Sequence, residues 1–155
     1  MLDAAGRHQE MIETNGVTLR TIIEGDGPLA VLLHGFPRCW YLWRHQIDPL
    51  VKAGFRVAVP DQRGYGASSC PSRIEDYNLL ELTTDVVGLI DALGEEKAYL
   101  VGHDWGCIVA WYTALQYPHR LHSVMGLSVP MLPICLLYTS PSPRDLSTAR
   151  MASCA

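Results

Sequence analysis

Short apolar runs that end in glycine, aspartate or proline alternate with helical patterns along this chain. Continuously apolar runs of this length are typical of strands that are buried on both faces of a parallel sheet. The runs are PLAVLLHG (28–35), FRVAVPD (55–61), KAYLVG (97–102) and LHSVMGLSVP (121–130). The segments between them repeat apolar residues near the helical period, at 40–53, 79–94 and 105–118. This order predicts right-handed βαβ crossovers, and therefore an α/β fold with a mostly parallel sheet and helices on both faces.

The N-terminal segment EMIETNGVTLRTIIEG (10–25) predicts a β-hairpin. Apolar and polar residues alternate on both sides of Asn15-Gly16, and an Asn-Gly pair in that setting is the strongest short hairpin signal. Pro49 falls inside the helical segment 40–53, so we expect that helix to break or kink there. The segment QRGYGASSCPSRIEDYN (62–78) is rich in Gly, Ser and Pro, which predicts a long surface loop.

Composition and charge exclude several classes of protein. A chain of 155 residues, 48% apolar and 18% charged, suits one globular domain and is too short for two of ordinary size. The net charge of -4 gives no reason to expect nucleic acid or an anionic membrane as a partner. No apolar run approaches the ~20 residues that span a bilayer. The first residues lack the basic and apolar regions of a signal peptide, so we expect a cytoplasmic protein and leave the oligomeric state open.

The cysteines and histidines show no ligand-like spacing. The five cysteines form no C-x-x-C pair, and the six histidines include no H-E-x-x-H motif; the cysteines are Cys39, Cys70, Cys107, Cys135 and Cys154. This pattern argues against a disulfide framework and against a zinc site. We therefore expect reduced thiols, no metal and no cofactor.

Chemically unusual residues follow three of the predicted strands. They are His34-Gly35, the segment Asp61–Gly66 and the segment Gly102–Gly106. In parallel sheets, ligands bind beyond the carboxyl ends of the strands, and these ends meet at one edge. We therefore expect the functional site at this edge.

The triplet Gly102-x-Asp104-x-Gly106 has the form of the nucleophile elbow G-x-S-x-G, with aspartate in place of serine. A sharp strand-to-helix turn exposes the central side chain, and only glycine-sized neighbours let the backbones pass so closely. The helix N-terminus favours the ionised carboxylate. The alternative is that Asp104 only caps an ordinary helix. The strand before it and the helix after it favour the elbow.

The motif HGFP (34–37) directly follows the apolar run 28–33. In the elbow fold, the oxyanion hole combines the N–H after the nucleophile with one from the loop at this position. The donors would be the backbone N–H groups of Trp105 and Phe36. We expect His34 and His103 to be structural, because the elbow scheme takes its base from later in the chain. The residues expected to support the site are His34, Gly35, Pro37, Gly102, His103 and Gly106.

Two segments together resemble the N-terminal half of the α/β-hydrolase-fold epoxide hydrolases. They are HGFPRCWYLWRHQIDPLVKAGFRVAVPDQRGYGASS and VGHDWGCIVAWYTALQYPHRL, and the likeness runs from about Val17 to Pro133. The resemblance implies that Asp104 opens an epoxide and forms an ester. It further implies that a histidine activates water to hydrolyse this ester to a vicinal diol, and that two tyrosines of a cap domain bind the epoxide oxygen. The implied partners are a small-molecule epoxide and water, with Trp105 in the pocket wall.

Two other functions remain open from the sequence. A carboxylate attacks without a base, so it suits carbon–halogen bonds as well as strained epoxides. The alternative enzyme is therefore a haloalkane or haloacid dehalogenase of the same fold, although the resemblance to haloalkane dehalogenases would favour asparagine where Phe36 stands. The third possibility is a non-catalytic fragment. Cys107 departs from the family pattern, which commonly has glycine there, and its thiol is expected to crowd the elbow.

The last part of the chain departs from the family. After Asp104 the only candidates for a base and an acid are His119, His122 and Asp145, and both histidines are expected at the opposite sheet edge. CLLYTSPSPRD (135–145) resembles a translated transposase sequencing adapter. The prediction is therefore an N-terminal part of an α/β-hydrolase domain over 1–134, without cap and C-terminal strands, and an artefactual tail over 135–155. A genuine disordered Ser/Pro-rich tail is the alternative.

Such a fragment has consequences for activity and stability. Without a base the ester would form but turn over poorly, so the chain is expected to be inactive in multiple turnover. The strand at 121–127 would be left as an uncovered edge. We therefore expect the polypeptide to be poorly soluble or partly molten.

Overall fold

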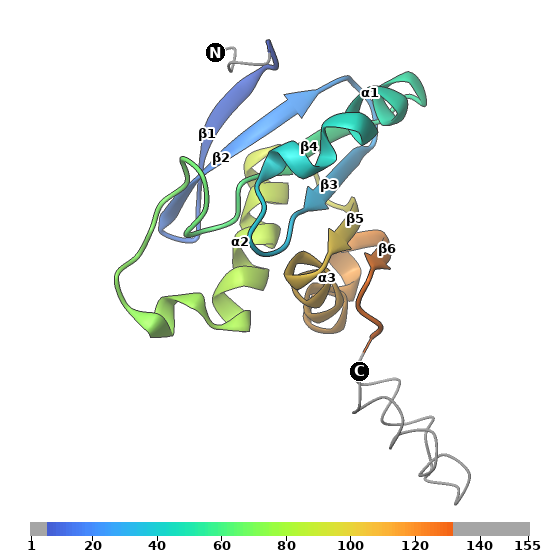
Figure 1. Ribbon diagram of the computed structural model, residues 1–155. Helices are drawn as coiled ribbons and strands as arrows, with labels where there is room; N and C mark the ends of the chain where they lie inside the picture. The colour runs from blue at the N-terminus through green and yellow to red at the C-terminus, as the bar shows by residue number, and fades with distance from the viewer. Residues whose placement is uncertain (1–5, 132–155) are drawn as a thin grey trace, which may run out of the picture.

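A six-stranded sheet organises residues 6–131, the part of the chain that the computed structural model describes (Figure 1). Its strands lie in the order β1-β2-β4-β3-β5-β6. They are β1 Gln9–Thr14, β2 Val17–Glu24, β3 Leu29–Leu33, β4 Arg56–Pro60, β5 Ala98–His103 and β6 Leu121–Leu127. The helices are η1 Trp40–Trp43, α1 Arg44–Lys52, η2 Ile74–Tyr77, α2 Leu79–Ala92, α3 Trp105–Gln116 and η3 Pro118–Arg120.

The predicted α/β fold and its hairpin are confirmed. Strands β1 and β2 pair antiparallel across the Asn15-Gly16 turn, and β2 pairs antiparallel with β4. From β4 onward the sheet is parallel, because β3 pairs in parallel with β4 and β5, and β5 with β6. All five residues of β3 are buried, as expected for a central strand covered on both faces.

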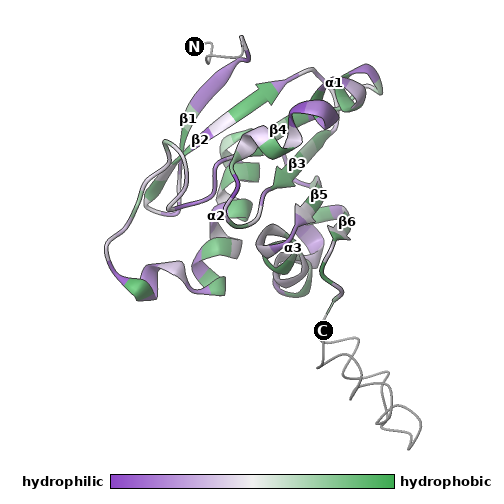
Figure 2. Cartoon of the chain, viewed as in Figure 1, coloured by the Kyte–Doolittle hydropathy of each residue, from purple (hydrophilic) through white to green (hydrophobic). Residues whose placement is uncertain are grey.

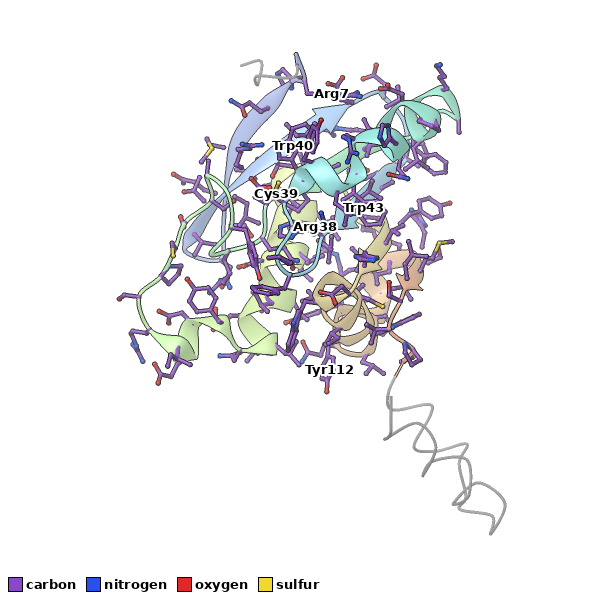
Figure 3. All side chains as sticks on the ribbon, in the orientation of Figure 1. Arg7, Arg38, Cys39, Trp40, Trp43 and Tyr112 are labelled. Carbon is purple, nitrogen blue, oxygen red and sulfur yellow. The ribbon has the colours of Figure 1, made fainter. Side chains whose placement is uncertain are left out.

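Two apolar layers hold the helices to the sheet. On one face, Val31 and Leu33 of β3 pack with the apolar side chains of α2 and α3. On the other face, Leu32 packs with Trp40, Trp43 and Ile47 from η1 and α1. The alternation follows from the two-residue period of a strand. Figure 2 shows the apolar residues along the inner strands, and Figure 3 places Trp40 and Trp43 on the helical segment that covers this second face.

Two local expectations are wrong. Helix α1 runs without interruption from Arg44 to Lys52 although it contains Pro49. The change of helix type comes earlier, where η1 meets α1 at Arg44, so the segment is broken before the proline and not at it. The segment 62–78 is not simply a surface loop, because Arg63 and Ser68 are buried and residues 74–77 form η2.

The last described strand is more exposed than the others and ends earlier than predicted. Strand β6 ends at Leu127 rather than at residue 130, and it forms an edge of the sheet. The exposed fractions of Met125 and Leu127 are 57% and 39%. The predictions for the tail at 135–155, for Asp145 and for the boundary at residue 134 lie outside the described residues. Between residues 6 and 131, no helix is long and apolar enough to cross a bilayer.

Candidate active site

The three segments that were expected to meet do lie at one edge of the sheet. Strands β3, β4 and β5 are parallel neighbours, so their carboxyl ends point the same way. Leu33, the last residue of β3, pairs with Gly102 near the end of β5. The loop after β3, the loop after β4 and the turn from β5 into α3 are therefore adjacent.

The turn at Asp104 has the geometry of a nucleophile elbow. Asp104 has φ 55° and ψ -123°, a left-handed conformation that is strained for a residue with a side chain. A Cβ atom on Gly102 would lie 2.2 Å from the carbonyl oxygen of Gly106. A Cβ atom on Gly106 would lie 2.5 Å from the carbonyl oxygens of Leu33 and His34. Both glycines are therefore required by the close approach of three backbone segments.

The Asp104 carboxylate is held by backbone amides rather than used as a helix cap. Asp104 precedes the first residue of α3, but its side chain makes no capping hydrogen bond. Instead, the N–H of Phe36 donates to Oδ1 of Asp104 at 2.9 Å. The backbone N–H groups of Trp105 and Phe36 lower the pKa of Asp104. The site thus presents an ionised carboxylate between two amide donors.

Hydrogen bonds lock His34 in the loop that carries Phe36. The ring is fully buried, its Nδ1 lies 3.0 Å from the carbonyl oxygen of Gly35, and its Nε2 lies 2.9 Å from the backbone nitrogen of Gln62. These partners assign the proton to Nδ1, because Nε2 must accept from an N–H group. Burial lowers the pKa of His34, so the ring is neutral at pH 7. Pro37 follows Phe36 through a cis peptide bond.

The other histidines take different positions. Nδ1 of His103 is buried and has no hydrogen-bond partner in the described part of the chain. His119 lies in η3 and His122 near the start of β6. Both are therefore at the amino-terminal ends of the parallel strands, whereas Asp104 follows the carboxyl end of β5. Within residues 6–131, no histidine donates a hydrogen bond to Asp104.

A cavity of about 180 Å³ opens beside the elbow. Gly35 and Trp105 line it from the elbow side, and Gln62, Arg63 and Tyr65 line it from the loop after β4. The Tyr65 ring packs edge to face against His34, with 4.9 Å between the ring centroids. The sequence placed Asp61–Gly66 at this edge but assigned no role to its side chains.

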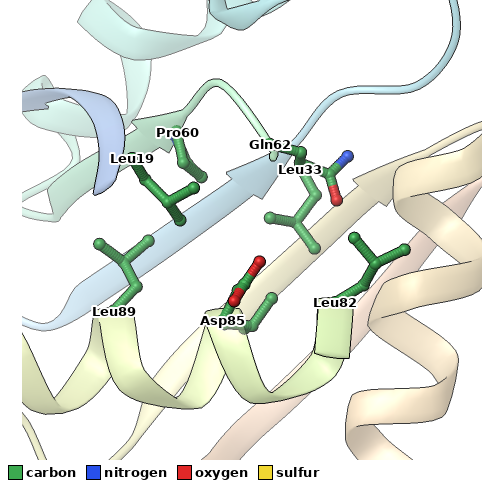
Figure 4. Close-up of a pocket in the computed structure, with 8 residues that line it drawn as sticks. Leu19, Leu33, Pro60, Gln62, Leu82, Asp85 and Leu89 are labelled. Carbon is green, nitrogen blue, oxygen red and sulfur yellow. The ribbon is translucent and has the colours of Figure 1, made fainter. Parts of the chain in front are cut away.

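A buried ion pair lies behind this cavity. Nε of Arg63 donates to Oδ2 of Asp85 at 2.6 Å, and Nη2 donates to Oδ1 at 2.5 Å. Oδ1 also accepts from the Asn15 amide at 3.0 Å. Burial raises the pKa of Asp85, and the hydrogen bonds from Arg63 and Asn15 oppose that rise. Figure 4 shows Asp85 on α2, facing a small cavity of about 10 Å³ that Gln62 also lines.

The sequence contained a sign that Asp85 needs a polar partner, but nothing that identifies Arg63 as that partner. Asp85 occupies the apolar face of α2, one residue before the buried Val86, and an acid at such a position needs a partner. Arg63, which lies between the buried strand β4 and Gly64, supplies the opposite charge.

Cys107 fits at the base of the elbow because of a glycine on β6. The thiol is buried and donates to the carbonyl oxygen of Val129 at 3.0 Å. A Cβ atom on Gly126 would lie 2.4 Å from Sγ of Cys107. The expected crowding is therefore absorbed by Gly126. Elsewhere in the described range 6–131, no three His, Cys, Asp or Glu side chains cluster as metal ligands.

A mostly parallel sheet with helices on both faces and a G-x-D-x-G elbow after β5 defines a hydrolase-like α/β protein. A family model described as the alpha/beta hydrolase fold matches residues 28–151. The chain therefore belongs to the α/β-hydrolase-fold family.

Several similar proteins are named as epoxide hydrolases. Epoxide hydrolase A of Mycobacterium tuberculosis is 50% identical over 127 residues, which make up 81% of this chain and 39% of the relative. The crystal structure of Epoxide Hydrolase A from Mycobacterium thermoresistibile matches with a TM-score of 0.79 at 54% identity, over 80% of this chain and 40% of that one. The crystal structure of epoxide hydrolase VrEH1 from Vigna radiata matches with a TM-score of 0.79 at 42% identity, over 84% of this chain and 41% of that one. The chain thus spans about 40% of the length of the proteins that it matches.

Proposed function

We propose that this chain carries the nucleophile and oxyanion side of an epoxide-opening active site. The carboxylate of Asp104 attacks a carbon of the epoxide ring, forms a new C–O bond and breaks the ring C–O bond. The released alkoxide takes a proton from water, which leaves a hydroxyalkyl ester on Asp104. The names of the similar proteins support the substrate class.

The observation that carries the proposal is the setting of the Asp104 carboxylate. An ionised carboxylate on a strained, accessible elbow is a nucleophile that needs no base. Since the N–H of Phe36 holds Oδ1, we assign the attack to Oδ2. The amides of Phe36 and Trp105 would later stabilise the oxyanion when water attacks the ester, a role in which one lost donor typically costs ~10²–10³ in rate.

The remaining residues of the motifs support these groups. Gly102, Gly106 and Gly35 provide the close backbone approach. His34 and Pro37 shape the loop after β3, and His103 ends β5 directly before the nucleophile. The proposed chemistry uses a carboxylate and water, so it calls on no cofactor. We place the protein in the cytoplasm as part of the same proposal, on the basis of scattered cysteines without disulfide spacing.

The second step, hydrolysis of the ester, needs a base that activates water. Within residues 6–131 no histidine is positioned for it, since His34 is locked in its loop, the Nδ1 atom of His103 is buried, and His119 and His122 lie at the opposite ends of the strands. We therefore propose that the 155-residue chain opens an epoxide once and keeps the ester.

Mass spectrometry of the chain after incubation with styrene oxide tests this directly. The expected result is a mass increase of one epoxide per chain, mapped to Asp104. Asp104→Asn should abolish the adduct, whereas Asp26→Asn, an exposed aspartate distant from the elbow in sequence, should leave it unchanged. An adduct on other residues in the same yield as on Asp104 would refute the proposal. Alkylation of Asp104 by a haloalkane with halide release, and none by the epoxide, would assign the dehalogenase instead.

A further inference from the structure

We propose that Gln62 is a positioning residue for the amide donor of Phe36. Gln62 is the second residue after β4, and it reaches across to the loop after β3. The inference rests on the proposed function for its kinetic readout, but its main readout is a property of Asp104 that does not require turnover.

Gln62 holds His34 at two points. Its backbone N–H donates to Nε2 of the His34 ring at 2.9 Å, and its side-chain amide donates to the His34 carbonyl oxygen at 2.5 Å. The same carbonyl oxygen lies against Gly106, where a Cβ atom would be 2.5 Å from it. The carbonyl of His34 is therefore fixed between the elbow and the Gln62 side chain.

The fixed position of His34 is passed along the backbone to Asp104. The His34 ring donates from Nδ1 to the carbonyl of Gly35, which sets the peptide that leads into Phe36. Gly35 lies so close to the nucleophile that a Cβ atom there would be 2.3 Å from Oδ1 of Asp104. The next N–H along the chain, that of Phe36, donates to this oxygen at 2.9 Å. Displacing the His34 carbonyl would thus displace the amide.

Close packing alone does not hold the Gln62 side chain. It lines the small cavity between α2 and the sheet on one side and the 180 Å³ cavity beside Trp105 on the other. With open space at both flanks, the hydrogen bond from its amide to the His34 carbonyl oxygen is the main restraint on the position of the side chain. A Gln62→Met substitution keeps the length of the side chain and the backbone N–H bond to the His34 ring, and it removes the side-chain amide.

The experiment measures the pKa of Asp104 by carboxyl NMR of the full 155-residue chain. The backbone N–H groups of Trp105 and Phe36 lower this pKa, so misplacing the Phe36 amide must raise it. We expect the pKa of Asp104 to rise in Gln62→Met, and the pH titration of the Phe36 amide shift to weaken. The control is Gln46→Met, at an exposed position on α1, which should change neither.

Single-turnover alkylation by styrene oxide gives the kinetic readout. Because attack requires a well-oriented carboxylate, we expect Gln62→Met to react about tenfold more slowly than the wild type, with an unchanged unfolding midpoint. If Gln62→Met does not fold, Gln62→Ala is measured in the same way. The Asp104 pKa and the alkylation rate are compared only between folded proteins.

The outcomes separate this inference from the proposed function. An unchanged Asp104 pKa in a folded Gln62 variant would overturn the positioning role, even if alkylation slows. A raised Asp104 pKa in the variant, with no alkylation of the wild type by any epoxide, would support the positioning role and overturn the epoxide-opening function. Slower alkylation together with the raised pKa supports both.

Discussion

Asp104 and Asp85 are both aspartates, but their surroundings differ completely. Asp104 stands on a strained turn, is accessible, and is held by backbone amides that lower its pKa. Asp85 is buried in α2, faces the guanidinium of Arg63 through two hydrogen bonds, and has its pKa raised by burial. The charge of Asp104 is available to react with a substrate. The charge of Asp85 is paired with Arg63 and holds the loop after β4 in place.

The difference shows how a fold separates reactive from structural acids. Backbone amides stabilise a carboxylate without covering it, because the loop and the helix that carry Phe36 and Trp105 fix their positions. A buried guanidinium stabilises a carboxylate by occupying both of its oxygens, which leaves none for a substrate. The predictions below test whether these two environments are as different as their geometry indicates.

The largest effect is expected from breaking the Arg63–Asp85 pair. Arg63→Met leaves Asp85 buried without its cation, and removing one partner of a buried pair typically costs about 3–5 kcal/mol. Urea unfolding followed by circular dichroism measures the loss. Arg73→Met is the control, since the Arg73–Glu75 pair is exposed and such pairs contribute little. A loss for Arg63→Met as small as that of the control would show that the pair does not hold the loop.

A smaller loss is expected at the elbow itself, where sterics replace charge. Gly106→Ala places a methyl group 2.5 Å from two carbonyl oxygens, and overpacking of this kind costs about 1–3 kcal/mol. Gly94→Ala is the comparison for backbone strain without a steric contact. Gly94 has φ 78°, and a Cβ atom there meets no other atom within 4 Å. Thermal unfolding of both variants gives the comparison. A Gly106→Ala variant as stable as the wild type would mean that the elbow tolerates the methyl group by moving away from β3.

The elbow could be predicted from sequence because its signals are local. The apolar run of β5, the glycines around Asp104 and the helical period of α3 stand next to each other in the chain. The hairpin at Asn15-Gly16 was predictable for the same reason. The Arg63–Asp85 pair and the double contact of Gln62 with His34 join residues 22 and 28 positions apart, and no local pattern pairs them. The prediction at Pro49 is wrong, because the helical segment changes type at Arg44 and α1 then continues through the proline.

The two aspartates should titrate in opposite directions from the ordinary value. Asp104 has a lowered pKa, so its contribution to stability is present above the pKa of the unfolded chain and is lost as the pH falls through the folded value. Asp85 has a raised pKa, so protonation favours the folded state in the range between the unfolded and folded values. On acidification, carboxyl NMR should show Asp85 taking up its proton before Asp104. If Asp104 took up its proton before Asp85, the proposed difference between the two carboxylate environments would be wrong.

The smallest effect concerns the backbone strain at Asp104. A residue with a side chain at φ 55° costs of order 1–3 kcal/mol, and glycine avoids that cost but loses about 0.5–1 kcal/mol in backbone entropy. Asp104→Gly and Asp104→Ala both remove the carboxylate and its hydrogen bond from Phe36, so their difference isolates the strain. We expect Asp104→Gly to be more stable than Asp104→Ala by about 1 kcal/mol in urea unfolding. If Asp104→Ala is as stable as Asp104→Gly, the strain at this position is no larger than the entropy cost of glycine, about 0.5–1 kcal/mol.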